Sequence, residues 1–160
     1  MNWFTNTCFQ LKAFNLGLIT SLLLTFGCHK NAIDCSQLLR YLHEVHGAGS
    51  SLGNKVIIIL NLEGCSPCVE SHLKELMGLG KRENFLLIIV GNSPNNEYLT
   101  AINELEFDIS WDSNKLIYKY ATPFGKPLLV HLAKGSCLRY EEINDPDIEP
   151  VYNLIKKWTK

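Results

Sequence analysis

The chain has 160 residues, of which 46% are hydrophobic, and a formal net charge of −1 at pH 7. This length is enough for one domain with one hydrophobic core but not for two. With 15 basic against 16 acidic residues and no basic patch, the composition excludes nucleic acid as an expected partner.

Residues 1–27 have the pattern of an export signal that does not belong to the fold. Lys12 supplies positive charge, and residues 13–26 are mostly apolar. This stretch is too short to span a bilayer comfortably as a permanent helix. We therefore expect a signal peptide that is cleaved before Cys28.

The residues around the expected cleavage site resemble the lipobox of bacterial lipoproteins, because small Gly27 and then Cys28 follow the apolar stretch. The resemblance implies lipid chains on Cys28, followed by a tether over 28–33. Thr25 and Phe26 depart from the usual lipobox residues. A signal peptide without lipid, or an uncleaved anchor, is the alternative. Each of these places the domain outside the cytoplasm.

The folded domain is expected to span residues 34–160, and its elements follow in chain order. The segment 34–46 has apolar residues at helical spacing, with Asp34 or Ser36 available as a cap. The segment 55–62 carries a run of Val, Ile and Leu without alternation, which fits a strand that is covered on both faces. The later elements are expected to be a helix ending at 79, a strand at 84–90, a helix at 94–105, an extended segment at 107–111, a helical turn ending at 120, strands at 128–132 and 136–140, and a helix at 147–157.

These elements alternate between strand and helix, and then two strands follow each other across the tight turn at 134–135. This order predicts an α/β sandwich with a mixed central sheet flanked by helices. In the last helix, Val151, Leu154, Ile155 and Trp158 are expected to face inward.

The four residues Cys65-Ser66-Pro67-Cys68 lie between the apolar strand and an amphipathic helix. Two intervening residues let the two sulfurs close a short ring. The helix N-terminus stabilises an anion, which should favour the thiolate form of Cys65. Strand, CxxC and helix together indicate a dithiol redox site.

Other functions of a CxxC motif are less consistent with this sequence. A structural zinc site needs a second pair of ligands, and none follows at suitable spacing. His72 lies four residues after Cys68, on what we interpret as a solvated helix face. A static Cys65–Cys68 disulfide would gain little from closing so short a loop. No metal or organic cofactor is expected.

From Cys65-Ser66-Pro67-Cys68 and from Pro127 at the head of the strand 128–132, the chain resembles the thioredoxin superfamily, in particular membrane-tethered thiol-disulfide oxidoreductases of the TlpA/ResA type. The resemblance implies a three-layer thioredoxin-like sandwich. It also implies that Cys65 is the nucleophile and Cys68 the resolving cysteine.

The same resemblance implies a cis-proline at Pro127, beside the CxxC motif in space. A cis X-Pro bond costs little and turns the preceding backbone toward the site. The main chain of Lys126 could then pair with an extended substrate peptide. Pro123 is the competing candidate, and ordinary trans prolines are the alternative to both.

Two residues depart from the family pattern. Gly64 replaces a tryptophan before the first cysteine, so the substrate-binding surface there is smaller. Ile59 replaces a buried acid that moves the proton of the second cysteine. Proton transfer would then fall to Glu63, to Glu70 or to water, with Glu63 the first choice because it lies close to Cys65 in sequence.

The remaining cysteines and histidines have no assigned chemistry. Cys35 and Cys137 could form a structural disulfide or remain two buried thiols, and the sequence leaves both options open. His43, His46 and His131 are interpreted as surface or satisfied core residues, because none has a second ligand at metal spacing.

The function expected from the sequence is thiol-disulfide exchange on exported proteins, in the reducing direction. The expected partners are an exported substrate with a disulfide or thiols, a membrane thiol protein that exchanges electrons with Cys65 and Cys68, and the membrane that holds the lipid anchor. The expected location is a bacterial cell envelope, facing the periplasm or the exterior. The alternative is a non-catalytic binding or assembly module. A peroxidase is disfavoured because residues 61–64 lack the upstream Pro and Thr of peroxiredoxins.

Overall fold

The computed structural model describes residues 34–47, 52–92, 96–120, 124–144 and 148–159. The expected signal peptide, the lipobox with Cys28 and the tether lie outside the described residues, as does Pro123. Among the helices that are described, none is long and apolar enough to cross a membrane.

A five-stranded mixed sheet forms the centre of the fold, with the strand order β3-β2-β1-β4-β5. β1, β2 and β3 are parallel, and β4 runs antiparallel to both β1 and β5. The tight turn that was expected at 134–135 joins β4 to β5. The strands are β1 (Val56–Asn61), β2 (Arg82–Val90), β3 (Phe107–Asp112), β4 (Leu128–Ala133) and β5 (Ser136–Glu142).

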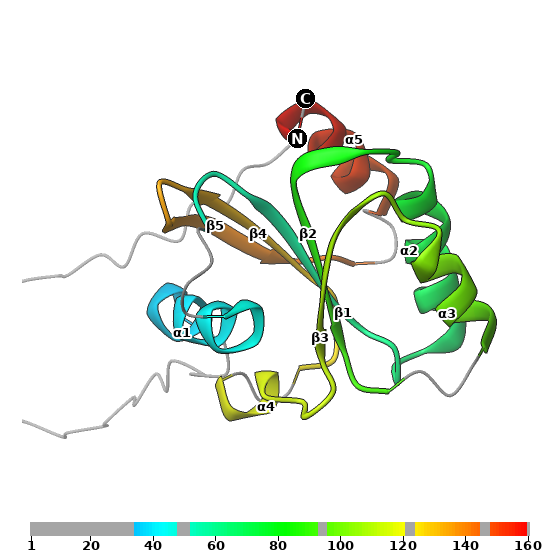
Figure 1. The fold of residues 1–160 in the computed structure, drawn as a ribbon, viewed down its shortest axis with the longest axis horizontal. Coiled ribbons are helices and arrows are strands. Elements are labelled where there is room, and N and C mark those ends of the chain that lie inside the picture. The colour runs from blue at the N-terminus through cyan, green and yellow to red at the C-terminus, as the bar shows by residue number, and fades with distance from the viewer. Residues whose placement is uncertain (1–33, 48–51, 93–95, 121–123, 145–147, 160) are drawn as a thin grey trace, which may run out of the picture.

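Helices cover both faces of this sheet (Figure 1). One face carries α1 (Cys35–His46) and the short α4 (Ile117–Tyr120). The other carries α2 (Ser66–Met77), α3 (Asn96–Asn103) and α5 (Ile148–Trp158). The α/β three-layer sandwich expected from the sequence is therefore confirmed.

The unbroken apolar runs of β1 and β2 fill both cores, because successive side chains of a strand point to opposite faces. Ile58 and Leu60 pack under α2 and α5, whereas Ile57 and Ile59 pack under α1. Each fully buried side chain of this kind contributes about 1.5–3 kcal/mol relative to an exposed one. The lack of alternation between apolar and polar residues in this segment predicted a strand covered on both faces, and the structure confirms it.

Polar side chains fix the ends of two helices on the α1 face. Asp34 caps α1 by accepting a hydrogen bond from the Gln37 backbone N–H at 2.8 Å. Asp112, buried at the end of β3, accepts from the backbone N–H groups of Leu116 and Ile117 at 2.7 and 3.0 Å. The Tyr41 hydroxyl also donates to Asp112, at 3.2 Å. The end of β3 is therefore tied to both α1 and α4.

The last helix is rotated relative to the expectation. Val151, Ile155 and half-buried Trp158 pack inward as expected, but Leu154 is 37% exposed. Tyr152, whose exposed fraction is 0%, takes the inward place instead. The error matters because Tyr152 contacts a residue of the site described below.

A disulfide joins Cys35, at the first turn of α1, to Cys137 in β5. It ties the first helix to the edge strand across a sequence separation of 102 residues. The structure thus resolves the choice that the sequence left open between a disulfide and two buried thiols.

Removing this disulfide should destabilise the fold substantially. In the chain-entropy model, opening a loop of this length costs about 4 kcal/mol. We expect the double variant Cys35→Ala/Cys137→Ala to lose about that much free energy of unfolding, measured by denaturant titration under non-reducing conditions. The matched control is Cys65→Ala/Cys68→Ala, whose loop is very short. A loss no larger than that of the control would contradict the prediction.

Candidate active site

The CxxC motif begins α2 directly after β1. Cys65 is the N-cap of α2 and has extended backbone angles, and its carbonyl accepts the first helical hydrogen bond, from Val69 N–H at 3.0 Å. Pro67 lies in the first turn, where its missing N–H has no helical acceptor to lose. Helix α2 therefore begins at Ser66, three residues before the amphipathic pattern becomes visible. An anion at Cys65 would lie at the positive end of the helix dipole.

The two sulfurs differ in accessibility. Cys65 is exposed, Cys68 is half-buried, and neither is bonded to another cysteine in this structure. An exposed first thiol can meet a disulfide on another protein, whereas the second can be reached mainly from within the site. This asymmetry fits the roles of nucleophile and resolving cysteine.

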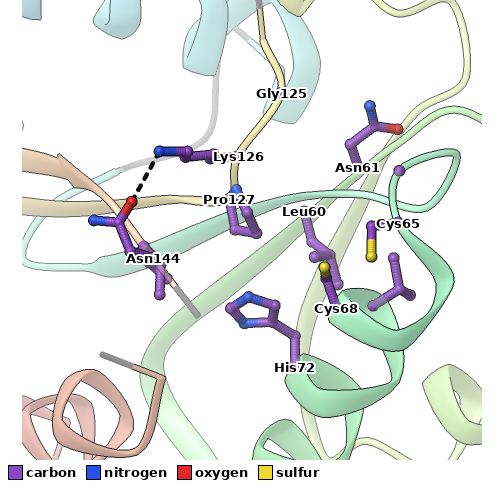
Figure 2. A pocket seen from close by; sticks show the side chains of 12 residues that line it. Leu60, Asn61, Cys65, Cys68, His72, Gly125, Lys126, Pro127 and Asn144 are labelled. Atoms are coloured by element: carbon purple, nitrogen blue, oxygen red, sulfur yellow. Dashed lines mark hydrogen bonds between the residues drawn. The ribbon is translucent and has the colours of Figure 1, made fainter. Parts of the chain in front are cut away.

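Both cysteines line one cavity of about 320 Å³ (Figure 2). The lining comes from the end of β1, the first two turns of α2, the segment before β4 and the segment after β5. It consists of Leu60, Asn61, Gly64, Cys65, Cys68, Val69, His72, Gly125, Lys126, Pro127, Ile143 and Asn144. The structure thus brings Cys65, Cys68, Gly64, Lys126 and Pro127 to one cavity, and their roles stay predictions.

Strand pairing explains why Pro127 faces the cysteines. β1 and β4 are antiparallel, and their register ends at Ile59 opposite Leu128. Pro127 therefore lies beside Leu60, where β1 leads toward the CxxC loop. The Pro127 carbonyl accepts a hydrogen bond from Ile143 N–H at 2.8 Å, which holds this corner in place. The cis state of the Lys126–Pro127 bond stays a prediction.

Lys126 directs its ammonium group to the far rim of the cavity. Its Nζ donates to Asn144 Oδ1 at 2.9 Å and lies 3.8 Å from the Glu142 carboxylate (Figure 2). The side chain is therefore occupied with the segment after β5, and the main chain of Lys126 is the part that lies across from the cysteines. Asn144 and Ile143 belong to no recognisable sequence motif, so the sequence did not predict that they line the cavity.

Glu63 lies outside the cavity lining, although it is only two residues from Cys65. Its carboxylate forms an ion pair with Lys115 at 2.6 Å and accepts from Asn92 N–H at 3.4 Å. The hydrogen bond from Lys115 holds the pKa of the Glu63 carboxyl below its usual range. Glu63 thus ties the loop after β1 to the ends of β2 and β3, and the geometry gives no support to its expected role in proton transfer.

Glu70 is also engaged away from the sulfurs. It accepts hydrogen bonds from Ser66 Oγ and Tyr98 Oη, both at 3.2 Å, and these two hydroxyls lie 2.6 Å apart. The three side chains tie the first turn of α2 to α3. This network was not predicted, because nothing in the sequence pairs Tyr98 with the motif.

The interpretation of His72 as a residue on a solvated helix face is wrong. His72 is 1% exposed and lines the cavity, one helical turn after Cys68. Its Nδ1 lies 3.2 Å from Tyr152 Oη in α5, and the two rings are tilted by 48° at 5.9 Å. Since α2 packs this face against the sheet and α5, a residue four positions after Cys68 must turn inward with it.

The other described histidines have the ordinary roles that the sequence predicted. His131 stacks on Trp158 with ring centroids 4.8 Å apart, His46 Nδ1 lies 2.8 Å from Ser110 Oγ, and His43 is exposed on α1.

No protein-family model matches the chain, and the search of curated proteins finds no match. Several solved structures resemble it. A candidate thiol:disulfide interchange protein DsbE from Chlorobium tepidum is 14% identical, with 69% of this chain and 82% of that chain covered and a TM-score of 0.44. A candidate thioredoxin from Neisseria meningitidis has 22% identity, coverage of 67% and 76%, and a TM-score of 0.45. StoA from Bacillus subtilis has 16% identity, coverage of 71% and 87%, and a TM-score of 0.43. At these values, function must be argued from the site itself.

From the geometry of Glu63, we expect the substitution Glu63→Gln to lower the stability of the fold in a pH-dependent way. We expect no effect on the rate of disulfide exchange. Because the folded-state pKa is lowered, the contribution of the Glu63–Lys115 pair is present above the unfolded pKa of about 4.5 and is lost as pH falls through the lower folded value. Glu63→Gln should slightly lower the thermal midpoint near neutral pH, and the difference from wild type should vanish in acid.

The same variant should leave the rate of disulfide exchange at neutral pH within about twofold of wild type, since surface ion pairs contribute little. Lys115→Gln, which removes the same ion pair, is the matched control. A much slower exchange in Glu63→Gln but not in Lys115→Gln would restore Glu63 as the proton-transfer group.

Proposed function

We propose that the protein is a thiol-disulfide oxidoreductase that works through Cys65 and Cys68. One observation carries the proposal. An exposed cysteine at the N-terminus of α2 and a half-buried cysteine one turn later open into the same cavity, which Pro127 borders from the opposite side. The resemblance of the motif to the thioredoxin superfamily supports the same conclusion.

The proposed reaction balances without a cofactor. The Cys65 thiolate attacks a substrate disulfide, the substrate S–S bond breaks, and one substrate sulfur leaves as a thiolate that takes a proton from water. The Cys68 sulfur then attacks Cys65, which forms the Cys65–Cys68 disulfide and releases the second substrate thiol. The dithiol supplies both electrons, so the cysteine pair itself is the redox group.

The cavity supports a protein substrate better than a small one. Cys65 lies at an exposed rim, and Gly125 and Lys126 are exposed beside it. An extended peptide could lie along the Lys126 main chain as an added strand, which gives affinity through backbone hydrogen bonds and tolerates varied side chains. Gly64 presents only its backbone beside Cys65, and an added Cβ would lie 3.3 Å from the Asn61 carbonyl oxygen.

The substrates we propose are exported proteins, and the proposed direction is reduction, with electrons from a membrane thiol protein. Support comes from the N-terminal segment with its lipobox-like Cys28, which would anchor the domain to the membrane of a bacterial cell envelope. The Cys35–Cys137 disulfide adds to this, because structural disulfides belong mainly to oxidising compartments outside the cytoplasm.

A non-catalytic binding module is the second candidate, and the observation that favours it is the lack of a carboxylate among the described residues that line the cavity. Without an acid beside Cys68, the dithiol could be chemically slow while the cavity still held a peptide. The two candidates differ in turnover, which the following test measures.

We expect the full-length chain in detergent to accelerate the reduction of insulin by dithiothreitol, followed by the precipitation of the freed chains. Cys65→Ser should return the rate to the uncatalysed background, since the nucleophile is lost. Cys68→Ser should turn over more slowly than wild type, because dithiothreitol must then resolve each mixed disulfide. Without dithiothreitol, this variant should stop after one exchange and retain the substrate as a mixed disulfide. Isolating that species from cells would identify the natural substrate.

The matched control is Leu138→Ser, a change at an exposed β5 residue outside the cavity lining, which should keep the wild-type rate. Equal rates for wild type, Cys65→Ser and Cys68→Ser would contradict the enzyme and favour the binding module.

A further inference from the structure

The resolving step requires a proton acceptor for Cys68. A thiolate, not a thiol, attacks the mixed disulfide, so the Cys68 proton must leave before or during the attack. Cys68 is half-buried, and the cavity beside it has apolar walls at Leu60, Val69 and Ile143. A group within the cavity is therefore better placed than bulk water to take this proton.

The lining contains no carboxylate among the described residues. Ile59 packs in the other core, beneath α1. Glu63 is engaged by Lys115, and Glu70 by Ser66 and Tyr98. None of these side chains therefore offers a base to Cys68.

His72 is the titratable side chain that the fold places beside Cys68. The two residues are four positions apart on α2, and side chains with that spacing lie next to each other on one helix face. Both line the cavity, and Figure 2 shows the imidazole and the Cys68 sulfur on the same wall. Proton transfer between side chains placed in this way can run through one bridging water.

Tyr152 fixes the imidazole in this position. Its Oη lies 3.2 Å from His72 Nδ1, and both side chains are almost fully buried. Burial, and then the charge of Glu75, raise the pKa of Tyr152 far above its usual range, so the phenol stays neutral. When Nδ1–H donates to Tyr152 Oη, the lone pair of the imidazole is on Nε2, which can accept a proton.

We propose that His72 accepts the proton of Cys68 during resolution and that Tyr152 positions the imidazole for this transfer. The inference rests on the proposed exchange function. The proton passes from Cys68 Sγ to His72 Nε2, the Cys68 thiolate attacks Cys65 Sγ, and the bond from Cys65 to the substrate sulfur breaks. The departing substrate thiolate takes the proton from the imidazolium, so His72 ends neutral.

The charged and titratable groups around His72 determine how the rate of the resolving step should depend on pH. They are Cys65 and Cys68 on α2, Tyr152 on α5, and Lys126 before β4, whose ammonium is bonded to Asn144. Glu75 acts on Tyr152. Among these, His72 is the group whose ordinary ionisation falls between pH 5 and 8.

A chromogenic aryl disulfide separates the two steps on the full-length chain in detergent. Reduced protein with the Cys35–Cys137 bond intact should release one coloured thiol when Cys65 attacks and a second when Cys68 resolves the mixed disulfide. In His72→Gln, we expect the first phase to be unchanged and the second to slow about 100-fold. The second phase should also lose the inflection near the histidine range and simply rise with pH.

Two controls separate a chemical from a structural role. His131→Gln changes a histidine outside the cavity lining and should leave both phases unchanged. Tyr152→Phe keeps the ring but removes the hydroxyl, and it should slow only the second phase, by about tenfold. If His72→Gln does not fold, Tyr152→Phe tests the role of His72 in its place. An NMR titration of the wild-type His72 ring is the second test, and the titration curve should differ between the dithiol and disulfide forms.

The outcomes for the two claims are distinct. An unchanged second phase and pH profile in His72→Gln would overturn the role of His72 and leave the exchange function intact. If His72→Gln does not fold, an unchanged second phase in Tyr152→Phe, together with identical NMR titrations in both redox forms, would do the same. No release of coloured thiol by the wild type would overturn the exchange function itself.

Discussion

The antiparallel pairing of β1 with β4 is the contact on which the site depends. The CxxC loop follows the C-terminal end of β1, the central strand, and the antiparallel pairing brings the start of β4 to the same end. Pro127 therefore lies opposite the cysteines. The bond from Ile143 N–H to the Pro127 carbonyl extends this arrangement into the segment after β5. If β4 slipped by one residue, its side chains would exchange faces and the cavity would lose its far wall.

The side chains around the CxxC motif fall into two groups: those that hold the backbone of the motif in place and those that face the cavity. Glu63 with Lys115 holds the loop before Cys65, and Ser66, Glu70 and Tyr98 hold the first turn of α2. These polar groups fix positions. From α2 and its N-cap, the two sulfurs, Val69 and the buried imidazole line the cavity. The sulfurs and the imidazole are the groups that the proposed exchange uses.

Much of this arrangement follows from local sequence pattern. The unbroken apolar run before the motif predicts a strand buried on both faces, and the CxxC spacing with Pro67 predicts a helix start. These two predictions rest on neighbouring residues whose geometry is set by one element. The place of Pro127 beside the motif is different, because only the resemblance to a known family implied it, and the structure puts Pro127 in the same cavity lining.

The errors concern relations between elements. His72 looked solvated because its helix was considered without α5. In α5, Tyr152 is buried and contacts His72, whereas Leu154, which was expected to face inward, is 37% exposed. Glu63 was chosen for its closeness in sequence, whereas Lys115, 52 residues away, determines where its carboxylate lies. Which polar group reaches a buried sulfur is a tertiary property, and a single sequence holds little signal for it.

The central claim is that Cys65 and Cys68 form and break a disulfide reversibly while the fold stays intact. The most direct measurement equilibrates the full-length chain in glutathione buffers of graded potential and follows alkylation of each cysteine by mass spectrometry. The account predicts one reversible two-electron transition, in which Cys65 and Cys68 change together. Independent alkylation of the two sulfurs, with no disulfide between them at any potential, would contradict it.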